Sequence, residues 1–268
     1  MRRKVILFGG CSHVLSLPSL WVKKYGISKG DEIHVEERGS SLVINSGKAI
    51  ENKAARITGG RGIAKRLSGL YCAGYDEIEV RLESKEDIRL VEGSIRRRLM
   101  GFEVVHVRGR DCVIRDISSA RLGEFDNILR RVFIMLCSLE GSYRKDYVEN
   151  ALKLCAFCKR CLSKKEYVSH TYSMGLFALV TELERIASVW GGLGGRGLGR
   201  ASGSLRKINE LFYSFDNKKA EEACRSLNSR IRALVRKGNP DAHTHSVISL
   251  ARNCLNALEI ISSLHAAA

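Results

Sequence analysis

The residues of this chain that are best suited to bind a charged ligand lie near its start. The first 30 residues contain six Lys or Arg and no Asp or Glu. Ser12 and His13 follow two glycines in this segment and add hydrogen-bonding groups. Cations on a surface without carboxylates are typical of contacts to nucleic-acid phosphates. The residues that we expect to contact DNA are Arg2, Arg3, Lys4, Ser12, His13, Lys23 and Lys24.

A second group with potential chemistry is the C-x-x-C-x-x-C run of Cys155, Cys158 and Cys161, which includes Lys159 and Arg160. Closely spaced thiolates bind zinc or iron–sulfur clusters, and nearby cations can lower a thiol pKa enough for redox sensing. However, the sequence places no fourth ligand nearby, and the three cysteines share one broad face of a predicted helix. Cysteine on a buried helical face behaves as a small apolar residue. We therefore expect core packing, with a thiol-based metal or redox sensor as an alternative.

Motifs of common catalytic sites are missing from the sequence. It contains no phosphate-binding G-x-x-x-x-G-K, no G-x-S-x-G nucleophile turn and no zinc-binding H-E-x-x-H. We therefore predict that the protein is not an enzyme and has no cofactor.

A small β unit must position the basic N-terminal residues. The pattern of residues 1–47 predicts strand, turn, strand, a short helix, strand, turn and strand. About 46 residues bury too little apolar surface to be stable alone, so we expect this unit to pair with a second chain. The residues expected in its core are Val5, Leu15, Leu17, Trp21, Ile33, Val35 and Val43.

This unit resembles the AbrB/SpoVT family of swapped-hairpin DNA-binding domains. The resemblance rests on residues 9–18, which read Gly-Gly-x-Ser-x-x-Val-x-Leu-Pro, and on residues 21–26 and 29–33. It implies that two chains interleave their hairpins into one dimeric β-barrel, and that basic residues on this barrel bind DNA.

Residues 48–117 are expected to form a small α+β module with three strands and two helices. Ser84 and Asp87 have the spacing of a helix-capping pair. The three arginines at 96–98 are expected on a solvated helix face. The predicted elements are, in order, helix 63–72, strand 77–82, helix 85–100 and the hairpin strands 103–107 and 112–116.

Residues 118–268 are expected to be entirely helical. A glycine-rich linker at 191–203 separates three predicted helices from three more, which indicates an internal duplication. The helices are predicted at 118–139, 146–161, 165–190, 202–215, 217–237 and 242–265.

With its AbrB-like start, the chain resembles archaeal proteins that join such a domain to a PhoU-like helical region. The resemblance rests on residues 74–78, 98–104, 128–133 and 183–187. It implies a pair of three-helix bundles, often dimeric, and a link to the control of phosphate uptake.

The acidic metal-binding motifs of PhoU bundles are not reproduced in this chain. The position four residues after Glu184 is Ser188, and residues 251–255 of the second half contain no acid. Carboxylates on one helix face are what hard cations require, so we do not transfer a metal site.

The composition agrees with a nucleic-acid-binding protein inside a cell. The chain has 45 Lys and Arg against 29 Asp and Glu, a net charge of +16. This excess is +3 in residues 1–47, +4 in 48–117 and +9 in 118–268, so it is spread along the chain. We find neither a signal peptide nor an apolar run near the roughly 20 residues that span a membrane, and the nine cysteines are expected to be reduced.

The sequence therefore predicts a multidomain α+β protein that acts as a cytoplasmic, homodimeric DNA-binding transcription regulator connected with phosphate homeostasis. The alternative is an adaptor whose helical region binds a phosphate transporter or a signalling protein, while the N-terminal barrel mainly dimerises.

Overall fold

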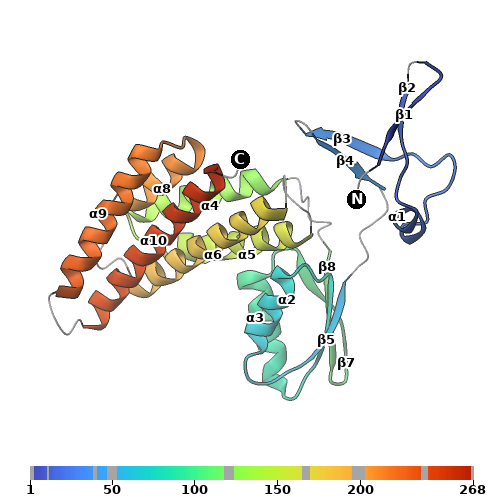
Figure 1. The fold of residues 1–268 in the computed structure, drawn as a ribbon. Helices are drawn as coiled ribbons and strands as arrows, with labels where there is room; N and C mark the ends of the chain where they lie inside the picture. The colour runs from blue at the N-terminus through green and yellow to red at the C-terminus, as the bar shows by residue number, and fades with distance from the viewer. Residues whose placement is uncertain are drawn as a thin grey trace. The chain divides into compact units, whose positions relative to one another are not determined.

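The computed structural model describes residues 3–10, 12–38, 41–46, 53–117, 124–164, 170–194, 203–236 and 241–266. The chain divides into two compact units, Met1–Asn52 and Lys53–Ala268. Figure 1 shows small β elements in the first unit, and a sheet followed by long helices in the second. The predicted α+β class is confirmed at this level.

The N-terminal unit contains two hairpins and one short helix. Antiparallel pairing joins β1 to β2 and β3 to β4. The predicted order of strands, turns and helix is therefore confirmed. Its elements are β1 (Val5–Phe8), β2 (Ser12–Leu15), α1 (Ser19–Lys24), β3 (His34–Arg38) and β4 (Ser41–Asn45).

Special backbone residues bound these short elements. Gly9 and Gly10, between β1 and β2, have φ angles of 62° and 77°, a left-handed conformation that residues with a Cβ disfavour. Helix α1 begins directly after Pro18, whose φ of −63° leads into a helix. The glycines and the proline thus set where the first hairpin turns and where α1 starts.

The second unit begins with a four-stranded sheet that α2 and α3 cover on one face (Figure 1). The strand order is β5-β6-β8-β7, with β5 parallel to β6 and the other pairs antiparallel. Along β6, Ile78 and Val80 are buried, whereas Glu79 pairs with Arg56 on the open face. The elements are β5 (Ala54–Thr58), α2 (Ile63–Cys72), β6 (Glu77–Arg81), α3 (Lys85–Arg98), β7 (Phe102–Arg108) and β8 (Asp111–Asp116).

The prediction of three strands in this module is wrong, because β5 is a fourth. Its sequence, Ala-Ala-Arg-Ile-Thr, has only one large apolar residue and gives a weak strand signal. The backbone hydrogen bonds of the parallel pairing with β6 hold this segment as a strand, although its own composition favours a strand only weakly. The N–H of Asp76 donates to the carbonyl of Lys53 at 2.8 Å, and the N–H of Gly59 donates to that of Arg81 at 2.7 Å, which extends the pairing at both ends of β5.

Asp87 anchors the start of α3. Its buried carboxylate accepts hydrogen bonds from the backbone N–H groups of Glu83, Ser84 and Gly60 at 2.7, 3.1 and 3.0 Å. Burial alone would raise the pKa of Asp87, but these three donors hold it below its ordinary value. The predicted capping pair of Ser84 and Asp87 is confirmed.

The rest of the described chain contains six helices longer than two turns. Helix α5 packs between α4 and α6, α10 packs between α6 and α9, and α8 contacts α4 and α10. All six were predicted from apolar periodicity; residues 118–123 and 165–169, also assigned to helices, lie outside the described residues. The helices are α4 (Phe125–Leu139), α5 (Lys145–Lys164), α6 (His170–Leu193), α8 (Ser204–Tyr213), α9 (Asn217–Arg236) and α10 (Ala242–Ala266).

Helix α6 runs further than the sequence predicts. The glycine-rich linker is expected from residue 191, but α6 continues through Gly191 and Gly192 to the buried Leu193. A Cβ at Gly191 would lie 2.9 Å from Cγ1 of Val148 on α5. Close packing of the two helices therefore outweighs the low helix propensity of glycine. Residues 195–202 of the predicted linker lie outside the described residues.

One continuous apolar core joins the α+β module to the helices. Helices α2 and α3 both pack on α5, so the sheet, these two helices and the bundle form successive layers. Among the described helices, α10 alone is long and apolar enough to cross a membrane by length and composition. Half of its most apolar 18-residue window is buried, and core helices meet the same criteria.

Candidate functional site

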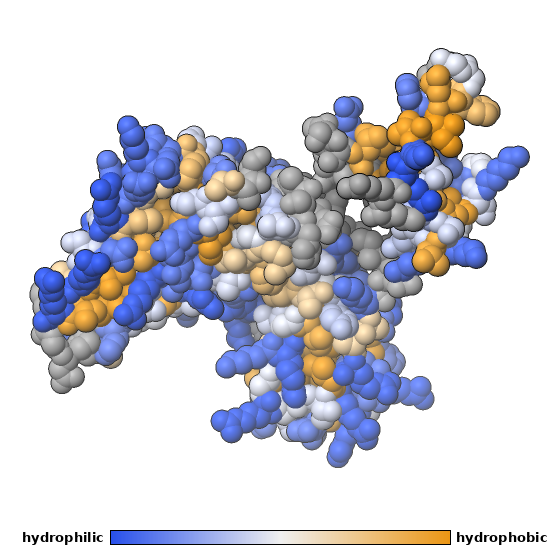
Figure 2. All heavy atoms as spheres, viewed as in Figure 1, coloured by the Kyte–Doolittle hydropathy of each residue, from blue (hydrophilic) through white to orange (hydrophobic). Residues whose placement is uncertain are grey.

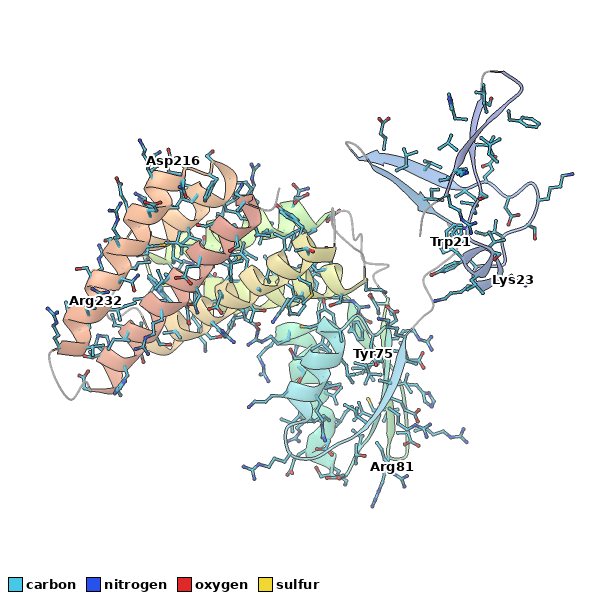
Figure 3. The ribbon with its side chains drawn as sticks, viewed as in Figure 1. Trp21, Lys23, Tyr75, Arg81, Asp216 and Arg232 are labelled. Atoms are coloured by element: carbon cyan, nitrogen blue, oxygen red, sulfur yellow. The ribbon has the colours of Figure 1, made fainter. Side chains whose placement is uncertain are left out.

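The predicted DNA-binding residues occupy three places in the N-terminal unit: the residues before β1, the start of β2 and the last turn of α1. All those that the structure describes are exposed, and Figure 3 marks Lys23 on α1. They are Arg3, Lys4, Ser12, His13, Lys23 and Lys24; Arg2 lies outside the described residues.

The hairpin register separates two of these places within one chain. Val5 lies opposite Leu15, and Phe8 lies opposite Ser12. The basic residues before β1 are therefore at the open end of the hairpin, while Ser12 is at its turn. At about 3.3 Å per residue, the two ends are about 10 Å apart. One chain alone does not gather the predicted residues into a single cluster.

The cations of this unit are not neutralised by neighbouring acids. Within the described residues, no carboxylate pairs with Arg3, Lys4, Lys23 or Lys24. The Nζ of Lys24 lies 5.5 Å from the centroid of the Tyr25 ring, a contact that leaves its charge available. These cations can therefore bind phosphate oxygens without first breaking an ion pair.

The N-terminal unit also exposes its apolar side chains. None of its described side chains is buried. The four residues of β1, Val5 to Phe8, are 58–72% exposed although consecutive strand residues point to opposite faces. Figure 2 shows hydrophobic atoms gathered over the β1–β2 hairpin. Both faces of this hairpin thus lack a cover in the single chain.

The predicted core of this unit is therefore not present within one chain. Val5, Leu15 and Val35 are exposed in the single chain, so their place in the core of a two-chain barrel stays a prediction. The unit is too small to fold a layer over them. Leu17, Trp21 and Ile33 are partly exposed, and the side chain of Val43 lies outside the described residues.

The three cysteines of α5 behave as core residues. Cys155, Cys158 and Cys161 are all buried. Burial raises the pKa of Cys161 to about 12, and it raises the pKa of Cys155 and Cys158 as well. These directions disfavour the thiolate, the form that reacts in redox chemistry. Within the described residues, no three His, Cys, Asp or Glu side chains are grouped to hold a metal ion.

A buried ion-pair network that the sequence did not predict joins α5 to the α+β module. The side chain of Arg160 is fully buried and donates to Asp76 at 2.7 Å and to Asp116 at 2.8 Å. Burial would raise the pKa of Asp76, but Lys164, a backbone N–H and Arg160 together lower it. One feature of the sequence could have indicated these ion pairs. Ala156, Arg160 and Lys164 are spaced four residues apart, so they share one helix face, which combines an apolar core residue with two cations.

A second charged contact links α3, α5 and α6. Glu184 of α6 pairs with Arg98 at 2.6 Å and also with Lys159. The prediction that all three arginines at 96–98 are solvated is therefore wrong for Arg98, because α6 brings a carboxylate to it. Glu184 is one of the residues on which the PhoU resemblance was based, and these two cations neutralise it.

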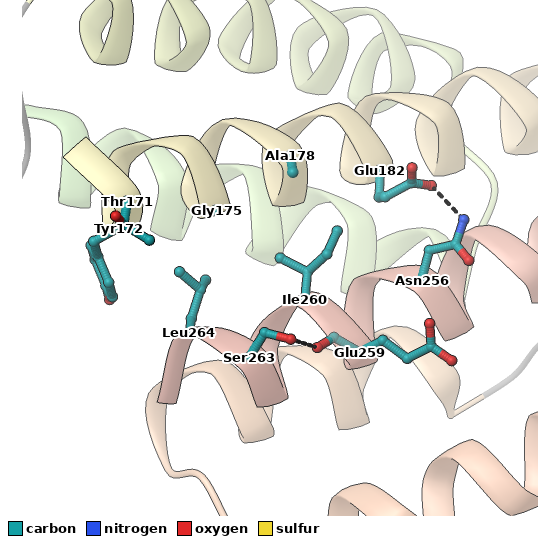
Figure 4. A pocket seen from close by; sticks show the side chains of 10 residues that line it. All are labelled: Thr171, Tyr172, Gly175, Ala178, Glu182, Asn256, Glu259, Ile260, Ser263 and Leu264. Carbon is teal, nitrogen blue, oxygen red and sulfur yellow. Dashed lines mark hydrogen bonds between the residues drawn. The ribbon is translucent and has the colours of Figure 1, made fainter. Parts of the chain in front are cut away.

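A cavity of about 530 Å³ lies between α6 and α10. Figure 4 shows Glu182, Asn256 and Glu259 toward one end, and Tyr172 and Leu264 toward the other. Its size is within the range of small-molecule sites, about 300–1,000 Å³. This cavity could not be predicted from the sequence, because it arises only where two helices distant in sequence pack together.

Comparison of the chain with protein families, with curated proteins and with solved structures finds no match.

Proposed function

We propose that this chain is a homodimeric, cytoplasmic DNA-binding transcription regulator, without enzymatic activity, that takes part in phosphate homeostasis. The observation that carries the proposal is the N-terminal unit, which exposes both faces of an apolar hairpin next to cations that have no acidic partner. Apolar surface of this kind is typical of an interface, and unpaired cations are typical of a phosphate-binding surface.

In the proposed dimer, the β1–β2 hairpins of two chains interleave into one barrel, as the AbrB/SpoVT resemblance implies. A strand in such a barrel needs apolar side chains toward the shared core. The side chains of β1 are exposed on both faces of the hairpin, so a partner chain can bury them. Among the described residues, dimerisation also doubles the number of Lys and Arg that are predicted to contact DNA, from four to eight.

We propose that these cations bind the phosphate groups of the DNA backbone. Phosphate contacts provide affinity and orientation, while base contacts provide sequence preference. Ser12 and His13, at the turn of the hairpin, are proposed to add hydrogen bonds near the groove. Because each neutralised phosphate releases counterions, binding should weaken steeply with salt.

The helical region is proposed to be a PhoU-like pair of three-helix bundles that receives the regulatory signal. The packing of α5 on both α4 and α6, and of α10 on both α8 and α9, supports this arrangement. The ion pairs of Arg160 and Glu184 would couple these helices to the α+β module.

The test is binding to genomic DNA fragments across a salt series. Reversing Lys23 and Lys24 to Glu changes four sites per dimer, and we expect affinity to fall by about 100-fold or more and the salt slope to decrease. Residues 53–268, which have their own core, should not bind. A matched control is the double variant Lys218→Glu and Lys219→Glu, which reverses two exposed lysines at the start of α9.

Three results would count against the regulator. If the Lys23 and Lys24 variant binds DNA like the unchanged chain, the N-terminal unit is not the DNA contact. If residues 53–268 bind equally well, the same conclusion holds. A full chain that forms dimers without binding DNA favours the adaptor.

A further inference from the structure

The cavity between α6 and α10 has an unusual charge for this protein. The chain carries a net charge of +16, yet none of the ten residues that line the cavity is Lys, Arg or His, and two are Glu. Helices α6 and α10 together contain only two Lys or Arg, Arg185 and Arg252. Arg185 forms an ion pair with Glu182, so the negative charge of the lining that is not already paired belongs to the exposed Glu259.

One end of the cavity is built to hold a positive group. The side chain of Glu182 is only 8% exposed. One of its oxygens accepts a hydrogen bond from Arg185 at 2.5 Å, and the other lies 3.5 Å from the Asn256 amide nitrogen. A carboxylate has about four acceptor positions, so Glu182 can accept a further donor. Among the described residues, no side chain pairs with the carboxylate of Glu259.

The lining away from the Glu182 carboxylate includes apolar side chains. Figure 4 shows Tyr172 and Leu264 at that end and Ile260 between the two ends. The hydroxyl-bearing Thr171 and Ser263 also line the cavity. A Cβ at Gly175 would lie 2.5 Å from Cδ2 of Leu264, so the two helices meet closely here.

We propose that this cavity binds a small organic cation with an apolar body. Its ammonium group donates hydrogen bonds to Glu182 and Glu259, while its apolar body packs on Tyr172, Ile260 and Leu264. A bare metal ion would satisfy only the polar end and would leave the apolar end empty. The cavity belongs to the unit Lys53–Ala268, whereas the proposed DNA-binding residues belong to the unit Met1–Asn52, so its ligand can be tested without DNA.

The test compares three indole compounds of nearly equal shape and different charge on the full chain: tryptamine, tryptophol and indole-3-acetate. We expect calorimetry to show saturable binding of one tryptamine per chain. The neutral and the anionic compounds should bind at least about tenfold more weakly, because a charge-assisted hydrogen bond to a carboxylate is stronger than a neutral one and two carboxylates repel each other. Equal affinity for all three, or no tryptamine binding, overturns the proposal.

Two substitutions locate the binding. Glu259→Gln keeps the shape of an exposed side chain and should weaken tryptamine binding about tenfold. Ala178→Trp, at an exposed position on the rim, should abolish binding by filling the cavity.

The matched control is Glu221→Gln on α9, which removes one exposed carboxylate elsewhere and should leave binding unchanged. If Glu221→Gln and Glu259→Gln weaken binding equally, the attraction is general and the proposed site is wrong. Tryptamine binding is measured without DNA, so its failure leaves the proposed regulator untouched.

Discussion

The two units of this chain differ in how much of their apolar and charged surface they bury. Within the described residues, the N-terminal unit has no buried side chain, while the unit from Lys53 onward has a continuous core of strands and helices. The second unit also buries charges in pairs, as with Arg160 and Asp76. In the described part of the first unit, Arg3, Lys4, Lys23 and Lys24 have no acidic partner.

This difference indicates what each unit requires from outside. A domain with its own core is stable at any protein concentration, whereas a unit completed by a second chain depends on that concentration. Apolar surface that would destabilise an independent domain becomes useful once a partner covers it. Each of the following predictions tests this difference between the two units.

The largest effect should come from a charge placed in the uncovered hairpin. Leu7→Asp puts a carboxylate where we propose a dimer core, and unpaired burial of a charge costs several kcal/mol. We expect light scattering to show monomers for the variant and dimers for the unchanged chain, with DNA binding lost. Val107→Asp is the matched control, because Val107 is similarly exposed but lies on β7; dimers that persist in both variants would place the interface elsewhere.

The next largest effect concerns the buried ion pairs of the second unit. Arg160→Met leaves Asp76 and Asp116 without their buried cation, and we expect unfolding of residues 53–268 to become easier by about 3–5 kcal/mol. Denaturant titration measures it. Arg115→Met removes an ion pair from the open face of the sheet and should have a much smaller effect. Equal effects would show that the burial of Arg160 does not matter.

A smaller effect is expected at the start of α3. Asp87→Asn replaces one carboxylate oxygen by an NH2 donor, so at least one of the three N–H groups loses its acceptor, and the change should cost about 1–3 kcal/mol at neutral pH. Because the folded pKa of Asp87 lies below its unfolded value, its contribution is full above about pH 4 and is lost as pH falls through the folded pKa. The difference between variant and unchanged chain should shrink on acidification. A gap that stays constant with pH would contradict this account.

The smallest effect is expected in the cysteine run. Cys158→Ala removes one buried sulfur atom and should destabilise the second unit by about 1 kcal/mol. A chelator should leave the unfolding midpoint unchanged. At pH 8, alkylation of Cys155, Cys158 and Cys161 should be at least about 100-fold slower in the folded chain than after unfolding. Fast labelling, or a midpoint lowered by chelator, would revive the metal or redox alternative.

Periodic elements could be predicted from the sequence, and weak ones could not. The helices of the second unit have apolar residues at helical spacing, so each was found. Strand β5 was missed because its pairing partner β6, not its own composition, makes it a strand. The helical state of Gly191 was missed because its cause is a neighbour, Val148, that is 43 positions away.

The same distinction between local sequence and distant neighbours applies to the candidate sites. Exposure of the predicted basic residues follows from their local sequence, because short hairpins and the end of α1 have no layer to cover them. Long-range contacts decided the rest. Arg98 and Arg160 carry the same charge as their neighbours, yet α6 and the α+β module turn them into partners of buried or half-buried acids.

The sequence by itself determined the order of the elements, the surplus of positive charge and the acid-free start of the chain, because these depend on composition and on spacing over a few residues. Only the tertiary structure decided which cations are neutralised, that the three thiols are buried, and that an acidic cavity exists on a basic protein. Those properties depend on distances between residues far apart in the chain. Burial and electrostatic pairing change steeply over a few ångströms of such distances.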